Sequence, residues 1–118
     1  MRDFRELLVW RKAHELTLAC YKATDQFPAR EIYSLGNQMG RSSASVPTNI
    51  AEGCGHFANA EFHRYLQIAM ASSSEVDYQL LFPHDLGYLK NDEHSKLSAQ
   101  TLEMKRMLVA LAKKVAGN

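Results

Sequence analysis

Four stretches of the sequence carry apolar or small residues at the spacing of an α-helix, and this pattern constrains the fold more than any other feature. Within each stretch these residues recur at steps of three and four, which places them on one helix face. The stripes are Val9, Ala13, Leu16, Cys20, Ala23 and Phe27; Ile32, Leu35, Met39, Ser43, Val46 and Ile50; Phe62, Leu66, Ala69, Ser73, Val76 and Leu80; and Leu97, Thr101, Met104, Leu108, Leu111 and Val115. No stretch alternates with period two for long enough to make a strand, so we expect an all-α protein.

Glycine and proline residues separate the four stretches, at Phe27-Pro28, Gly53-Cys54-Gly55 and Gly87. A connection of a few residues cannot carry the chain back along a helix about 30 Å long, so consecutive helices must run antiparallel. The expected fold is an antiparallel up-down-up-down four-helix bundle. The 118 residues are enough for one domain, 1–118, with one core.

Asparagine and glycine residues mark the expected helix ends. Asn59 and Asn91 are placed to cap the third and fourth helices. Gly53 and Gly87 are placed to adopt the left-handed conformation that ends the second and third helices.

Two prolines lie inside predicted helices. Pro47 removes a backbone hydrogen bond and clashes with the carbonyl of Ser43, at a cost of about 3 kcal/mol unless something compensates. Because the apolar stripe continues to Ile50, we expect the second helix to be kinked at Pro47 but not broken. Pro83 is expected to end the third helix close to Leu81, with a short turn after it.

The second helix has two further unusual features. Gly36 and Gly40 each cost about 1 kcal/mol relative to alanine inside a helix, which suggests close approach of another helix backbone. A second face carries short hydrogen-bonding groups: Ser34, Gln38, Arg41, Ser45, Thr48, Asn49 and Glu52. This face is either simply solvated or meets another surface. In the second interpretation Gln38, Arg41, Ser45, Asn49 and Glu52 form an oligomer or partner face.

The overall charge gives no support to nucleic-acid binding, because Lys plus Arg exceed Asp plus Glu by only one, 14 against 13. The last residues of the chain are basic, but cations near the C-terminus of any helix are favoured by the negative end of its dipole. If the protein binds nucleic acid, the candidates are Arg11, Lys12, Arg41, His63, Arg64, Lys105, Arg106, Lys113 and Lys114. In an oligomeric ring each copy of the chain would contribute the same few cations, and together these would bind nucleic acid more tightly than one copy could.

Few residues suggest catalysis or metal binding. No Glu-x-x-His pair, HExxH motif, CxxC motif, phosphate-binding glycine loop or Gly-x-Ser-x-Gly elbow is present. Cys54, His56 and His63 could make only part of a zinc site, since a fourth ligand is not evident. We therefore predict no catalytic residue, no metal and no cofactor.

The expected location is the cytoplasm. No apolar run approaches the ~18 residues of a membrane span, and no signal-peptide hydrophobic region follows the first residues. Cys20 and Cys54 would make at most one bridge, and they are interpreted as reduced thiols. No membrane partner is expected.

The run from Arg41 to Gly53 reads RSSASVPTNIAEG. It resembles the signature of small bacterial four-helix-bundle proteins whose reading frames lie within intervening sequences of 23S ribosomal RNA genes. Matching positions extend along the chain: Phe4, Leu8 to Ala13, Phe27-Pro28, Glu31, Tyr33, Glu61-Phe62, Leu66 to Ala69, Ser72, Glu75 and Leu86 to Leu89. Where relatives commonly continue with an aromatic residue, a glycine and an arginine, this chain has Cys54, Gly55 and His56.

The resemblance implies a homopentameric ring. Relatives act as accessory proteins to the reverse transcriptase of diversity-generating retroelements, where they contact nucleic acid. The implied partners are therefore other copies of the chain, RNA or DNA, and a nucleic-acid-processing protein. The first functional expectation is a non-enzymatic ring that binds RNA or a nucleoprotein. The alternative is a scaffold that docks a protein partner without nucleic acid.

Overall fold

The computed structural model describes residues 2–117, and every regular element in that range is helical. Four long helices make up most of it: α1 (Leu8–Ala23), α3 (Asn37–Cys54), α4 (Asn59–Asp85) and α5 (Asn91–Ala116). Short turns complete the chain: the 3-10 turns η1 (Phe4–Glu6) and η2 (Thr24–Gln26), the α-helical turn α2 (Ala29–Glu31) and the π-helical turn η3 (Ile32–Gly36). None of the helices in residues 2–117 is long and apolar enough to cross a membrane.

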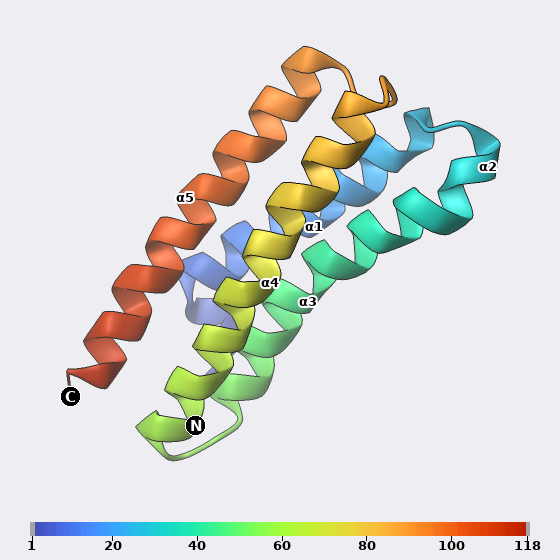
Figure 1. Ribbon diagram of the computed structural model, residues 1–118. Helices are drawn as coiled ribbons and strands as arrows, with labels where there is room; N and C mark the ends of the chain where they lie inside the picture. Colours follow the sequence, from blue (N-terminus) through green and yellow to red (C-terminus); the bar gives the residue numbers. More distant parts are fainter. Residues whose placement is uncertain (1, 118) are drawn as a thin grey trace.

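Each long helix packs against two others. Helix α1 contacts α3 and α5, and α4 contacts the same two, so α1 and α4 lie diagonally across the bundle. Figure 1 shows the four helices side by side in alternating directions. The molecule measures 46 × 22 × 20 Å, with its long axis along the helices. The predicted antiparallel up-down-up-down four-helix bundle is confirmed.

The core follows the predicted stripes closely. Every residue of the first and third stripes is buried, as are most of the second and fourth. Ile32 departs from the prediction, with 38% of its surface exposed, because it begins the π-helical turn, whose period differs from that of an α-helix. Leu111 is only partly buried, and the neighbouring Ala112 takes the core position.

Helix α3 continues through Pro47 without a break, as predicted; the kink itself stays a prediction. The proline has no N–H to donate to the carbonyl of Ser43. The buried hydroxyl of Thr17 on α1 lies 3.0 Å from that carbonyl oxygen and also 3.0 Å from the carbonyl oxygen of Ala13. A side chain from the neighbouring helix therefore compensates for part of the cost of the proline.

The prediction that Pro83 ends the third helix was wrong. Helix α4 runs to Asp85, and Pro83 is buried in its last turns. Because Pro83 is close to the C-terminal end of the helix, it removes one backbone hydrogen bond but leaves the hydrogen bonds of the preceding turns intact. Its own carbonyl accepts backbone hydrogen bonds from Tyr88 (2.9 Å) and Leu89 (3.3 Å), which close the turn into α5.

The glycines divide into a turn residue and packing residues. Gly87 has a φ of 82°, so its predicted left-handed conformation is confirmed. The same prediction for Gly53 was wrong, because Gly53 is a buried helical residue of α3. A Cβ atom there would lie 2.8 Å from Cβ of Tyr65 and 3.0 Å from Cδ1 of Phe62. Gly53 therefore allows α3 and α4 to approach closely.

Gly40 also marks a close approach, but of a side chain. A Cβ atom at Gly40 would lie 2.8 Å from Cζ of Tyr21, whose ring is half exposed. At Gly36 the nearest atoms are 3.5 Å away, an ordinary contact. The predicted close approach of another helix backbone was therefore wrong: at Gly40 a side chain approaches, and at Gly36 the contact is ordinary.

The predicted asparagine caps were wrong. Neither α4 nor α5 has a side-chain cap, and Asn59 and Asn91 are their first helical residues. Both amide oxygens instead bond to distant side chains. Asn59 accepts a hydrogen bond from Arg2 at 2.7 Å, and Asn91 lies 2.6 Å from Nε2 of His84. Each asparagine side chain therefore makes a contact with another part of the chain and does not cap its own helix.

Candidate nucleic-acid interface

The residues of the predicted oligomer or partner face all lie on α3: Gln38, Arg41, Ser45, Asn49 and Glu52. Glu52 also lines the cleft between α3 and α1, whereas the residues nearest Ser42 lie toward α4, because Ser42 donates a hydrogen bond to Glu75 on α4. Ser45 and Asn49 are half-buried and donate to backbone carbonyls of their own helix, at 2.7 and 2.8 Å. These two side chains therefore need no outside partner, and the exposed Gln38, Arg41 and Glu52 remain available.

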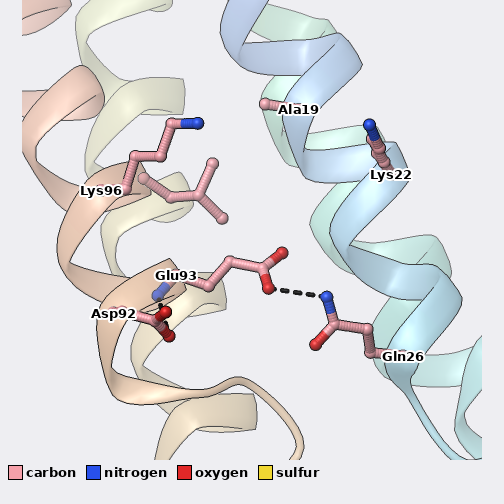
Figure 2. Close-up of a pocket in the computed structure, with 7 residues that line it drawn as sticks. Ala19, Lys22, Gln26, Asp92, Glu93 and Lys96 are labelled. Atoms are coloured by element: carbon pink, nitrogen blue, oxygen red, sulfur yellow. Dashed lines mark hydrogen bonds between the residues drawn. The ribbon is translucent and has the colours of Figure 1, made fainter.

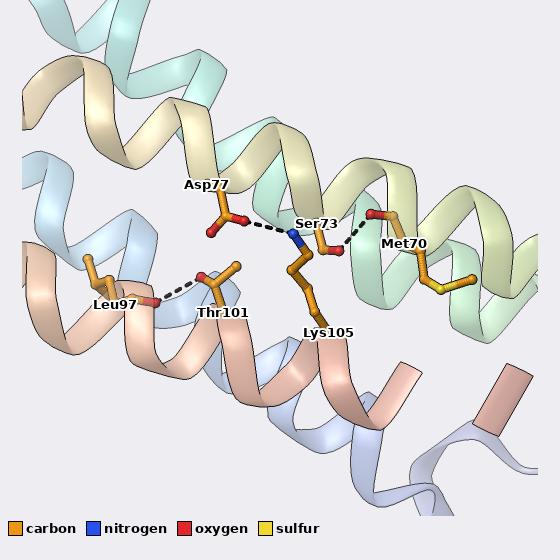
Figure 3. Close-up of polar contacts among 6 residues, drawn as sticks. All are labelled: Met70, Ser73, Asp77, Leu97, Thr101 and Lys105. Carbon is orange, nitrogen blue, oxygen red and sulfur yellow. Dashed lines mark hydrogen bonds and ion pairs between the residues drawn. The ribbon is translucent and has the colours of Figure 1, made fainter. Parts of the chain in front are cut away.

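Three of the nine predicted nucleic-acid-binding residues are ion-paired. The pairs are Lys12 with Glu103 (3.3 Å), Arg64 with Glu61 (3.3 Å) and Lys105 with Asp77 (2.9 Å). Figure 3 shows Lys105 reaching from α5 to Asp77 on α4, beside the buried Ser73 and Thr101. Ion pairs this exposed contribute about 0–1 kcal/mol, so a phosphate could replace a carboxylate at small cost.

The other six residues make no ion pair with any residue in the range 2–117: Arg11, Arg41, His63, Arg106, Lys113 and Lys114. Four of them, which we call the basic face, are exposed on the adjacent helices α1 and α5: Arg11, Arg106, Lys113 and Lys114. The Lys12–Glu103 ion pair sets the register of these helices, so Arg11 and Arg106 lie within about one turn of it. Arg41 lies apart from this face, because α3 is diagonally opposite α5.

Phe57 stands at the end of the bundle where α3 leads into α4. It occupies the loop between Cys54 and Asn59, and 85% of its surface is exposed. Arg2 crosses this end of the molecule, because its backbone N–H donates to the carbonyl of Cys54 at 2.9 Å. The Arg2 guanidinium lies 4.1 Å from the centre of the Phe62 ring. The sequence predictions included neither Arg2 nor Phe57, although Phe57 is an aromatic residue outside every helical stripe.

A stack of planar groups lies beside Phe57. The ring of His56 stacks on Tyr65, with 5.1 Å between centroids, and the guanidinium of Arg64 lies 4.6 Å from the same ring centre. The hydrogen bond and charge of Glu61 raise the pKa of Arg64. The sequence predictions named Arg64 as a nucleic-acid candidate and His56 only as part of a zinc site, and they did not name Tyr65, because a helical pattern does not reveal which rings and cations stack.

Helix α1 borders a small cleft of about 40 Å³, lined by Lys12, Glu15, Gln100 and Glu103, and two larger clefts. The first, of about 420 Å³, separates α1 from α3 and is mostly apolar, with Trp10, Pro47 and Ala51 in its lining. His14 stacks on Trp10 at 5.0 Å. The second cleft, of about 470 Å³, lies between the end of α1 and the start of α5.

Figure 2 shows that the second cleft mixes both signs of charge. Lys22 and Lys96 approach it from α1 and α5, and Asp92 and Glu93 stand at the start of α5. Gln26 donates to Glu93 across the cleft at 2.7 Å. Such a lining has no preference for an anion, and we exclude it from the candidate interface.

The cysteines are buried thiols. Burial raises the pKa of Cys20 to about 11 and also raises the pKa of Cys54, so both are mainly protonated near neutral pH. Within residues 2–117 no three His, Cys, Asp or Glu side chains converge in a way that could hold a metal ion. The partial zinc site considered for Cys54, His56 and His63 is therefore not assembled.

Two stacked histidines join α4 to α5. The rings of His84 and His94 lie 4.2 Å apart between centroids, 17° from parallel. His94 has a lowered pKa, chiefly because burial disfavours its charged form and also because of the charge of His84, with Asp85 opposing both effects. Nε2 of His94 lies 3.4 Å from the hydroxyl of Ser98.

This lowered pKa should make folding stability depend on pH. The folded state binds fewer protons than the unfolded state once the pH falls below the usual histidine value of 6.5. The stabilising contribution is therefore complete above that value and declines as the pH falls toward the folded-state pKa. In urea titrations between about pH 7.5 and 5, His94→Gln should lose less stability than the parent protein. Parallel losses in the two proteins would contradict the assignment to His94.

The chain is similar to proteins of one family over most of its length. A family model described as 23S rRNA-intervening sequence protein matches residues 5–110. Among solved structures, the chain is similar to a protein of unknown function from the S23 ribosomal protein family of Bacteroides thetaiotaomicron, with a TM-score of 0.83 and 20% identity. That alignment covers 90% of this chain and 96% of the other, and at this identity it shows the fold alone. No curated protein matches.

Proposed function

Because the chain belongs to the 23S rRNA-intervening sequence protein family, we propose that it is a non-enzymatic, cytoplasmic, homopentameric protein that binds RNA through its basic face. The observation that carries this proposal is the group of exposed cations on α1 and α5, which have no acidic partner in the described part of the chain. Phosphate binding depends on several cations that share one surface. The ring order comes from the family resemblance, and a nucleic-acid-processing protein is its proposed further partner.

Assembly explains how a nearly neutral chain could bind RNA well. One basic face offers few phosphate contacts, so a single copy should bind weakly. Several copies held in one ring convert later contacts into intramolecular ones, and affinity then rises without any new contact. Exposed apolar side chains in the last turns of α4 and directly after it also favour a protein contact: Tyr78, Leu81, Phe82 and Leu86.

Reversing two charges of the basic face should weaken RNA binding at least tenfold. The variant is Arg106→Glu with Lys113→Glu, and the probe is a structured RNA titrated across a salt series. Each lost phosphate contact should reduce the salt slope by about 0.7–0.9. Lys90→Glu with Lys96→Glu is the matched control, since it changes the net charge equally outside the basic face. Equal losses in both variants would mean that only net charge matters, and the basic face would have no special role.

Arg41→Glu tests the oligomer face. If exposed Arg41 contributes to the subunit contact, the reversed charge should reduce the mass measured by light scattering from that of a ring to that of a monomer. The circular dichroism of the helices should not change, because Arg41 makes no ion pair with any described residue of its own chain. A ring of unchanged mass would show that this face is not the subunit contact.

A further inference from the structure

We propose that the α3–α4 end of the bundle is a stacking site for an unpaired base of single-stranded RNA, with Phe57 as the platform for the base. This inference rests on the proposed RNA binding and deepens it by naming the form of RNA. It adds a site separate from the basic face, at one end of the bundle.

The first support is the exposure of the Phe57 ring in an anchored loop. The backbone N–H groups of Gly55 and His56 donate to Glu52 (3.1 Å) and Gly53 (3.2 Å), which fixes the end of α3. Helix α4 begins two residues after Phe57, so the loop is held on both sides. An apolar ring that is 85% exposed on such a loop contributes little to the core. It does present a flat apolar face to solvent, which any nucleic-acid base can cover.

The second support is the charge around this ring. Arg2 is bonded to Asn59, and its guanidinium rests on Phe62. Arg64 rests on Tyr65, although Glu61 neutralises part of its charge. A guanidinium that lies over an aromatic ring is stabilised there and loses part of its side-chain freedom, so both arginines are held at this end of the bundle. A phosphate that follows a base stacked on Phe57 would lie near Arg2, which is bonded to Cys54 and Asn59, the residues on either side of the loop.

The third support is a groove that continues from this end. A cleft of about 370 Å³ lies between the first turn of α4 and the last turns of α5, lined by Asn59, Ala60, His63, Val115 and Ala116. Lys113 and Lys114 are exposed in the same last turns of α5. Small side chains leave room for a strand, and the two lysines, which are not part of the lining, add positive charge to the same end of α5. The groove would thus connect Phe57 to the C-terminal part of the basic face.

Tyr33 shows why exposure alone is not sufficient. It is also 85% exposed, but it lies in η3 at the opposite end of α3, two residues after Glu31. Phe57, in contrast, follows His56 directly and lies in the loop between Cys54 and Asn59, both of which are bonded to Arg2. Tyr33 has one cation and one anion close in sequence, Arg30 and Glu31, whereas Phe57 lies in the loop flanked by the two residues bonded to Arg2, so Phe57 suits an anionic strand better.

Unpaired RNA fits this site better than a duplex. In an A-form helix the bases are stacked on one another and their faces are unavailable, so recognition uses shape and backbone. In a single strand each base can leave its neighbours and cover an aromatic ring. The site should therefore distinguish single-stranded from double-stranded RNA, which the basic face alone would not do.

The test compares two labelled probes on the full chain, a short oligouridine and a duplex RNA of the same length. Phe57→Ala should weaken oligouridine binding about 5- to 150-fold, the range for loss of one stacked base. Duplex binding should stay within about twofold, and the salt slope should not change, because phenylalanine carries no charge. Phe57→Trp should retain oligouridine binding, and Tyr33→Ala is the matched control and should bind both probes as the parent does.

Three results would overturn the stacking site. They are oligouridine binding by Phe57→Ala within about twofold of the parent, an equal loss on both probes, and an equal loss in Tyr33→Ala. In each case the parent still binds RNA, so the proposed function would stand without the stacking site. A parent protein that binds neither probe would overturn both proposals.

Discussion

Phe62→Ala should lower the free energy of unfolding by about 3–5 kcal/mol. Phe62 is fully buried in α4, where its ring packs close to Gly53 of α3 and beneath the guanidinium of Arg2. Truncation removes the transfer free energy of the ring and leaves a cavity that this tight helix contact cannot easily close. Since small proteins are stable by only about 5–15 kcal/mol, the loss is a large part of the total.

Urea titration followed by circular dichroism measures this effect. Protein concentration must be equal for all variants, because the stability of an oligomer depends on concentration. Phe57→Ala is the matched control, with the same substitution on an exposed ring, and should change stability by no more than about 0.5 kcal/mol. Similar losses in both variants would mean that the burial assigned to Phe62 is incorrect.

Thr17→Val should lower the free energy of unfolding by about 1–3 kcal/mol. Valine has nearly the shape of threonine but cannot donate a hydrogen bond to the carbonyl of Ser43, which also receives none from Pro47. A buried carbonyl left without a donor costs more than an average hydrogen bond contributes. The loss should therefore exceed the small cost expected of a shape-preserving substitution.

A double-mutant cycle with Pro47→Ala isolates this cause. The alanine N–H at position 47 could bond to the carbonyl of Ser43, so Thr17→Val should cost much less in that background. The coupling is the difference between the two costs, measured by chemical unfolding. Equal costs in both backgrounds would show that Thr17 acts through Ala13 or through packing, and not by compensating for the proline.

The four helices could be predicted because the spacing of apolar residues depends only on residues near one another in sequence, and most of these residues are also the ones buried in the core. The third stripe, from Phe62 to Leu80, is buried throughout, and α4 extends over its full length. Predictions failed where a distant group determined the local structure. Asn59 is bonded to Arg2, Gly53 faces the rings of α4, and neither neighbour could be identified from residues near it in sequence.

The candidate interface was predictable only in part, for a similar reason. The sequence shows which residues are cations, but it does not show which acidic residue each cation pairs with. Lys12 pairs with Glu103 and Lys105 with Asp77, and both pairs join residues that are far apart in sequence. Phe57 was missed because it belongs to no periodic stripe, and its significance depends on Arg2, which reaches the same end of the bundle from the start of the chain.

Phe57 and Tyr33, the two aromatic residues with 85% of their surface exposed, lie beyond opposite ends of α3. In a ring with cyclic symmetry every protomer points the same way. If the helices run along the ring axis, one rim would carry every copy of Phe57 with its cations, and the other every copy of Tyr33 and Glu31. Such an assembly would be polar. A single strand would thread along one rim and leave the opposite rim free for a different contact.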